Sequence, residues 1–206
     1  SDDLYDEYSC EIDKIKDEGS IPATRYWYYN TVTDQLVLTG GDTGIIAEKL
    51  TGDWSSYLRA VRGIVIDGDV SISDNAFEGL RNLSSVTFND EGSISHVGKD
   101  AFVGTAYWND IDNWQDGQLY VGDWLVGLRN VPGGEFEIDE DLKYAEGFLA
   151  RATGVTTLIL HTADFDTISD MLGYQGSNSE VKRFELFPRS VKNIVIADGV
   201  EEIDSM

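Results

Sequence analysis

A strand-and-turn pattern occurs twice between residues 61 and 102, and this repetition constrains the fold more than any other feature of the chain. Segments 61–66 (VRGIVI) and 83–88 (LSSVTF) both carry apolar residues at their first, fourth and sixth positions. Each is followed by an Ala-Phe pair, and the pairs Ala76-Phe77 and Ala101-Phe102 lie 25 residues apart. A period of about 20 to 30 residues that joins a short strand to a turn of packed aromatics is typical of solenoids, in which stacked units share one core.

Weaker copies of the same unit follow later in the chain. Ala145-Glu-Gly-Phe148 resembles the earlier Ala-Phe pairs, 155–160 (VTTLIL) has the strand pattern, and Thr167-Ile-Ser-Asp170 resembles Ser71-Ile-Ser-Asp74. A further strand begins at 191–196 (VKNIVI), and no Ala-Phe pair follows it before Met206. We expect either that this last unit continues into further repeats or that it is a degenerate cap.

The ordered series of motifs resembles the BspA-like family of bacterial leucine-rich repeat surface proteins. Segments 33–41 (TDQLVLTGG) and 54–57 (WSSY) are similar to the strand and Trp-Ser-x-Tyr entry that precede the first repeat in that family. Gly104-Thr-Ala-Tyr-Trp108, followed by 116–126 (DGQLYVGDWLV), is similar to a hairpin inserted between repeats. Three positions depart from the family pattern: Leu80 and Thr153 replace frequent cysteines, and the unit around Met171 lacks its Phe.

The fold class expected from these observations is α/β and β-rich, with short parallel strands. The resemblance implies a right-handed leucine-rich-repeat solenoid of four or five irregular units. Residues 1–60 would form an N-terminal arm and hairpin cap, and 61–206 the repeats, with a hairpin insertion at about 105–130. Strands at 25–29 and 35–38 are expected to form the first hairpin, and Gly122-Asp123 is a connection typical of a tight second hairpin. Residues 1–20 are predicted to form either a short amphipathic helix or a partly ordered arm, and residues 45–50 a helical turn.

The charge balance excludes some partner classes. Asp and Glu number 38 against 15 Lys and Arg, for a net charge of −23, and this field repels nucleic acid and anionic membrane surfaces. The chain lacks an apolar run of about 18 residues, so no membrane span is predicted. Cys10 is the one cysteine, which excludes an internal disulfide framework. An extracellular or cell-surface location is implied by the family resemblance alone, since the chemistry also permits a cytoplasmic protein.

Strand alternation divides each repeat into inward and outward residues. The residues expected to point into the core are Ile64, Ile66, Val86, Phe88, Leu158, Leu160, Ile194 and Ile196. The residues expected on the outward sheet face, which form the candidate protein-binding surface, are Val65, Thr87, Ile159 and Val195, flanked by Ser85, Thr157 and Asn193. The same row also fits ordinary strand propensity on a solvated sheet. The resemblance implies adhesion to an extracellular or host protein through this face.

Aromatic residues provide the alternative ligand class. Trp108 and Trp114 lie in a polar loop, where exposed indole rings would stack on sugar rings of a polysaccharide. The competing interpretation is that these rings pack the inserted hairpin. The alternative functions are therefore a carbohydrate-binding module or a structural spacer attached to a larger secreted enzyme.

Catalytic and metal-binding patterns are incomplete, so the sequence predicts no enzyme and no cofactor. Asp42-Thr-Gly44 matches half of an aspartic protease site, which needs two carboxylates. His96 and His161, the two histidines, lie in no nucleophile motif. Asp67-Gly-Asp69, Asp110-Ile-Asp112 and Asp139-Glu-Asp141 offer oxygen ligands that suit calcium, yet none completes a calcium loop. No metal site is assigned, and a weak loop-stabilising calcium ion remains the alternative.

Overall fold

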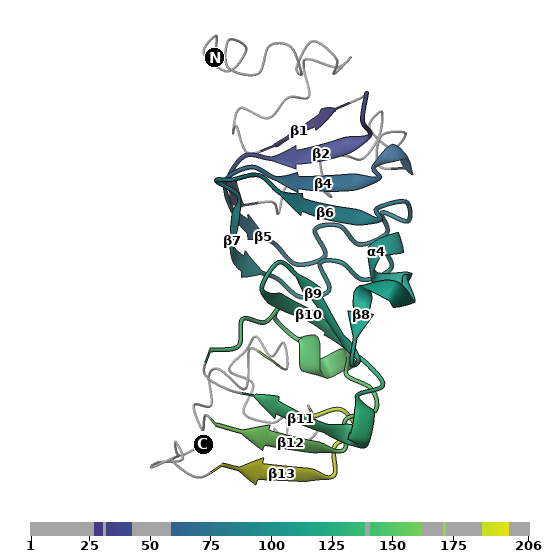
Figure 1. Ribbon diagram of the computed structural model, residues 1–206, viewed down its shortest axis with the longest axis vertical. Helices are drawn as coiled ribbons and strands as arrows, with labels where there is room; N and C mark the ends of the chain where they lie inside the picture. Colours follow the sequence, from purple (N-terminus) through teal and green to yellow (C-terminus); the bar gives the residue numbers. More distant parts are fainter. Residues whose placement is uncertain are drawn as a thin grey trace, which may run out of the picture. The chain divides into compact units, whose positions relative to one another are not determined.

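The computed structural model describes residues 27–30, 32–42, 59–138, 141–161, 171 and 187–197. These residues form short strands in four small sheets with few helical turns, so the protein is β-rich as predicted (Figure 1). The chain divides into two compact units, residues 1–110 and 111–206, which are described separately below.

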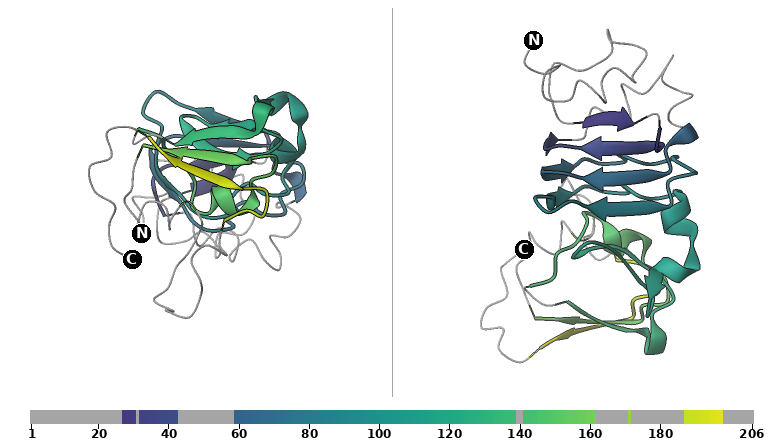
Figure 2. Two further views of the ribbon diagram at one scale, coloured as in Figure 1. Left: turned by 90° about the horizontal axis from the view of Figure 1, so that it is seen from below. Right: turned by 45° about the horizontal axis from the view of Figure 1, so that its top comes forward.

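The first unit contains a four-stranded sheet in the order β1-β2-β4-β6 (Figures 1 and 2). Strands β1 (Trp27–Asn30) and β2 (Gln35–Leu38) pair antiparallel, which confirms the first predicted hairpin. Strands β4 (Gly63–Ile66) and β6 (Ser85–Phe88) then add in parallel. The register places equivalent residues of consecutive strands opposite one another, as at Val37, Val65 and Thr87.

A second sheet, with parallel strands, is formed by the segments that follow β2, β4 and β6, each after a corner of the chain. It consists of β3 (Gly41–Asp42), β5 (Asp69–Ile72) and β7 (Ser93–Val97), in the order β3-β5-β7. The backbones at the corner approach too closely for any side chain. A Cβ atom on Gly68 would lie 2.4 Å from the carbonyl oxygen of Thr39, and one on Gly92 would lie 2.1 Å from that of Ile66.

The Ala-Phe turns stack as the 25-residue period predicts. Asn75 and Asp100, one residue before each alanine, both adopt a left-handed backbone, with φ of 55° and 59°. The backbone N–H of Phe77 donates to the carbonyl of Ala101 at 3.0 Å. The rings of Phe77 and Phe102 lie 5.2 Å apart and are 0% and 2% exposed, so the predicted stacking of these two side chains is confirmed. After the second turn, helix α4 (Ala106–Asn109) begins, capped by the Thr105 hydroxyl.

The second unit begins with 3-10 turn η3 (Ile111–Asn113) and an antiparallel sheet in the order β10-β9-β8. Its strands are β8 (Trp114–Gln115), β9 (Gln118–Val121) and β10 (Trp124–Leu128). Strands β9 and β10 form the predicted inserted hairpin around Gly122, whose φ of 60° meets the turn's need for a left-handed residue.

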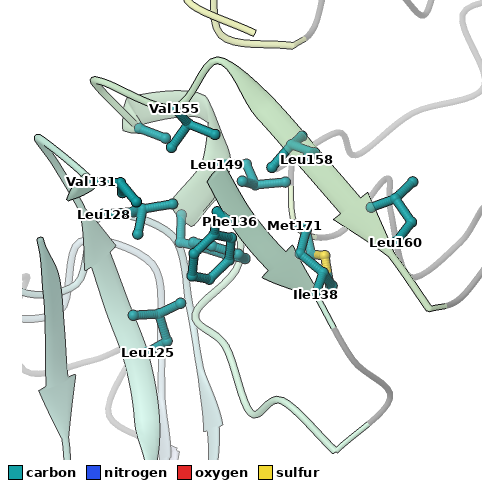
Figure 3. Close-up of a cluster of buried hydrophobic side chains, with 12 residues drawn as sticks. Leu125, Leu128, Val131, Phe136, Ile138, Leu149, Val155, Leu158, Leu160 and Met171 are labelled. Atoms are coloured by element: carbon teal, nitrogen blue, oxygen red, sulfur yellow. The ribbon is translucent and has the colours of Figure 1, made fainter. Parts of the chain in front are cut away.

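A parallel sheet completes the second unit, in the order β11-β12-β13. Its strands are β11 (Glu135–Ile138), β12 (Thr157–Leu160) and β13 (Asn193–Ile196). The 3-10 turn η4 (Pro132–Gly134) precedes β11, and the 3-10 turn η5 (Phe148–Arg151) lies between β11 and β12. One apolar cluster joins side chains of β10, β11, β12 and η5 (Figure 3). Within it, Phe136 meets Phe148 edge-on at 6.2 Å, so this unit also contains a buried aromatic pair.

The predicted core positions are partly confirmed. Ile64, Ile66, Leu158 and Leu160 are buried, and Val86 is half-buried. The prediction is wrong for Phe88, Ile194 and Ile196, which are 39%, 41% and 45% exposed. Strands β6 and β13 stand last in the order of their sheets. A side chain on the last strand has a neighbouring strand on one flank only, so an inward position does not ensure burial.

Several predicted features lie outside the described residues. They are the arm at 1–20, the helical turn at 45–50, the Trp54-Ser-Ser-Tyr57 entry, the Thr43-Gly44 part of the protease-like triplet and the copy at 167–170.

Candidate functional site

The first half of the candidate sheet face lies on β4 and β6. Val65 is opposite Thr87, and Gly63 is opposite Ser85. Ser85 and Thr87 are exposed and Val65 is half-buried. The hydroxyl of Thr87 donates to the carbonyl of Ile64 at 3.3 Å, so this hydroxyl has a partner within the sheet. This part of the face is therefore small, β-branched and uncharged.

The second half of the candidate face lies on β12 and β13. Ile159 is opposite Val195, and Thr157 is opposite Asn193. Val195 is 46% exposed, and the amide of Asn193 donates to the Thr157 hydroxyl at 3.3 Å. The structure thus pairs the predicted residues within each half, but the two halves belong to different sheets.

Strand β11 extends the second half with two acidic side chains that the sequence interpretation missed. Glu137 is opposite Ile159, and Glu135 is opposite Thr157. The Nε2 atom of His161 lies 2.5 Å from Glu137 Oε1, and both side chains are exposed. The alternating Glu-Phe-Glu-Ile pattern of 135–138 is a strand signal that could have located this segment.

The two candidate tryptophans differ in exposure. Trp108 is half-buried in α4, and its backbone N–H donates to the Thr105 hydroxyl at 3.0 Å. Trp114 is only 9% exposed, and the Arg129 guanidinium lies over its ring at 3.8 Å from the centroid. The expectation that Trp114 is exposed for sugar stacking is therefore wrong, because a cation from β10's continuation already covers that ring face.

A pocket of about 370 Å³ lies in the second unit. Its lining combines three carboxylates with an apolar floor: Asp116, Gln118, Tyr120, Val131, Pro132, Glu135, Phe136, Glu137 and Leu142. The hydroxyl of Tyr120 donates to Gln118 Oε1 at 2.7 Å, which orients the phenol ring at the wall. The lining contains acidic side chains and no Lys or Arg. These residues come from separate short segments between 116 and 142 that the fold brings together, so no single motif predicts the pocket.

Two titratable groups, Asp123 and Tyr107, have pKa values shifted from their ordinary ones. The Lys143 ammonium donates to the Asp123 carboxylate, and this hydrogen bond holds the pKa of Asp123 below its usual value of 3.8. Burial raises the pKa of the Tyr107 phenol above 10.0. Neither group belongs to the pocket or the sheet face, so both effects are structural.

The acidic pairs considered for calcium have other partners where they are described. Asp67 accepts a hydrogen bond from the Asn89 amide, and Asp69 accepts one from the Ser93 hydroxyl at 3.2 Å. In the part of the chain that the structure describes, no three His, Cys, Asp or Glu side chains gather in a metal-binding arrangement. The Asp and Glu at 139 and 140 lie outside that part.

The described helices are all too short or too polar to cross a membrane. Comparison with known proteins does not place the chain in a family: no family model, no curated protein and no solved structure matches it.

Proposed function

We propose that this chain is a non-catalytic binding module, secreted or displayed at a cell surface, that recognises a protein ligand. In this proposal the sequence repeats form an irregular leucine-rich-repeat solenoid of the BspA-like type. The ligand contacts the outward face of the strands, first of all the half of the face formed by β4 and β6.

The observation that carries the proposal is the stacking of equivalent residues at two separate places in the repeat. The strand positions Val65 and Thr87 pair in register, and the turn positions Phe77 and Phe102 stack in the core. The strand positions are 22 residues apart and the turn positions 25. A chain that repeats both elements at similar spacings presents the same side of every strand outward. Such a surface is extended and suits a protein rather than a small molecule.

The chemistry of the β4–β6 surface also favours a protein ligand. Ser85 and Thr87 have small exposed side chains that leave room for larger side chains of a partner. The Thr87 hydroxyl keeps its hydrogen bond to the Ile64 carbonyl when water is excluded, which limits the cost of burying it. Binding energy in protein interfaces concentrates where a central patch excludes water. The neutral centre here is surrounded by an acidic chain, so electrostatics favours a partner with a positive rim.

The test introduces a bulky charge into the surface without disturbing the core. Thr87→Arg changes an exposed outward residue of β6, and Thr33→Arg changes an exposed residue of the β1–β2 turn and is the matched control. Both variants are measured by surface plasmon resonance against a panel of purified extracellular proteins. For any protein that binds the wild-type chain, Thr87→Arg should weaken binding at least about tenfold, and Thr33→Arg less than about twofold.

A ligand whose affinity ignores Thr87→Arg, in a variant with unchanged circular dichroism, would contradict the β4–β6 surface. Ile159→Arg then tests the half of the face on β12. If that change is also without effect, the hairpin region from Trp108 to Leu128 becomes the better candidate.

A further inference from the structure

We propose that the acidic pocket of the second unit binds a lysine or arginine side chain of an extended protein segment. This inference goes beyond the sheet-face function, since it concerns the pocket at the edge of β11, next to the second half of the face, and a ligand of defined charge. It stands on the pocket's shape, on the composition of its walls and on the position of β11 in its sheet.

The pocket runs along the edge of β11 rather than over one face of the sheet. Glu135, Phe136 and Glu137 are consecutive residues, and all three line it. Because consecutive strand residues point to opposite faces, a cavity over one face would touch only alternate ones. Strand β11 is the first strand in the order of its sheet, so its far edge is an edge of that sheet.

The backbone of that edge is suited to an extended ligand. The carbonyl of Ile138 accepts from the N–H of His161, so the backbone groups of Ile138 point toward β12. Peptide groups alternate in direction along a parallel ladder, so those of Glu137 and Glu135 point to the opposite edge, where the pocket lies. An added strand can therefore pair with β11 in the manner of edge-strand recognition.

The walls select a basic side chain on such a strand. Tyr120, Phe136 and Leu142 provide apolar surface for the methylene stem of Lys or Arg. Carboxylates of Asp116, Glu135 and Glu137 are part of the lining, and the Cα atoms of Glu135 and Glu137 are roughly 7 Å apart along the strand repeat. Glu137 Oε1 also contacts His161 Nε2, so a bound cation shares this carboxylate with the imidazole. A guanidinium or ammonium group placed between them gains charge-assisted hydrogen bonds, and the Tyr120 ring adds a cation–π contact.

The charge of the whole chain supports the same ligand class. A net charge of −23 attracts cations over a distance of about 10 Å at moderate salt and repels phosphate backbones and anionic lipid. The pocket volume of about 370 Å³ falls within the range of small-ligand sites, about 300 to 1,000 Å³, so it has room for a single long basic side chain. A single long basic side chain is thus a suitable occupant.

The probe is a fluorescein-labelled octapeptide of alternating Thr and Lys, with an amidated C-terminus, titrated with the whole chain and followed by fluorescence anisotropy. The test variant is Glu135→Gln with Glu137→Gln. The control is Asp90→Asn with Glu91→Gln, an exposed pair in the first unit that removes the same charge. At about 50 mM NaCl we expect the pocket variant to lose at least about tenfold in affinity and the control less than about twofold.

Equal losses in the two double variants would overturn the proposal, because they would show attraction to net charge alone. Absence of peptide binding to the wild-type chain up to about 1 mM would overturn it as well. Competition by 1,5-diaminopentane at concentrations near the peptide's Kd would show that the free cation suffices and that no strand is recognised, and it would overturn the proposal. Normal peptide binding by the Thr87→Arg variant separates this site from the β4–β6 half of the sheet face, which the proposed function puts first, so either proposal can fail without the other.

Discussion

Replacing Phe77 with alanine tests the stacked turns of the first unit. The side chain is 0% exposed, and its ring centroid lies 5.2 Å from that of Phe102. An aromatic side chain buries roughly 150 to 250 Å², which at about 25 cal/mol per Å² corresponds to roughly 4 to 6 kcal/mol. Alanine keeps part of this burial and leaves a cavity, so we expect a loss of roughly 3 to 5 kcal/mol in the free energy of unfolding.

Chemical denaturation measures this loss, and hydrogen exchange of peptides from residues 61–103 places it in the first unit. Val32→Ala, in a turn residue that is 73% exposed, is the control and should change stability by less than about 0.5 kcal/mol. A double-mutant cycle of Phe77→Leu and Phe102→Leu should give a coupling energy of about 0.5 to 1.5 kcal/mol, because the rings are in contact.

Two results would refute the reasoning. One is a loss of less than about 1 kcal/mol in Phe77→Ala, which would mean that the ring is not packed in the core. The other is a coupling energy near zero, which would mean that the two turns do not stack.

Two further predictions concern the corners and the ion pair. Gly92→Ala should lower the free energy of unfolding by roughly 1 to 3 kcal/mol, because the added Cβ would lie 2.1 Å from the Ile66 carbonyl oxygen. The control is Glu91→Ala at the neighbouring exposed position, which should change this free energy by less than about 0.5 kcal/mol in thermal unfolding. Asp123 has a lowered pKa, so its small stabilising contribution is complete above pH 3.8, the ordinary value, and is lost as the pH falls through the lower pKa of the folded state. Lys143→Met should remove this acid-dependent difference, and an unchanged pH profile of the unfolding midpoint in that variant would exclude the pair as its cause.

The local elements of the fold could be predicted because their signals are local. The apolar spacing of 61–66 and 83–88 determines which strand residues can share a face, and the Ala-Phe period determines which turns can stack. Gly122 marked the hairpin because its turn requires a left-handed backbone. In each case the responsible residues lie within one short segment or at equivalent positions of two successive repeats.

The candidate sheet face was predicted only in part for the same reason. Alternation along a strand correctly paired Val65 with Thr87 and Ile159 with Val195. It did not indicate that these pairs belong to different sheets, because sheet membership depends on strands far apart in the chain. Strand β11 was not predicted, although its Glu-Phe-Glu-Ile sequence alternates polar and apolar residues as a half-buried strand does.

Sequence alone therefore determined the spacing of the stacked turns, the positions of β1, β2, β4, β6, β9, β10, β12 and β13, and the acidic character of the chain, but it did not predict β3, β5, β7, β8 or β11. Tertiary structure decided which of these residues are covered. Phe88 has the pattern of a core residue, yet it is 39% exposed on the last strand of its sheet, whereas Trp114 has a polar neighbourhood in sequence and is covered by Arg129. The acidic pocket likewise exists only where Asp116, Tyr120 and Glu137 meet. Burial and pocket formation depend on the number and kind of neighbours in space, and a chain's local pattern does not contain that information.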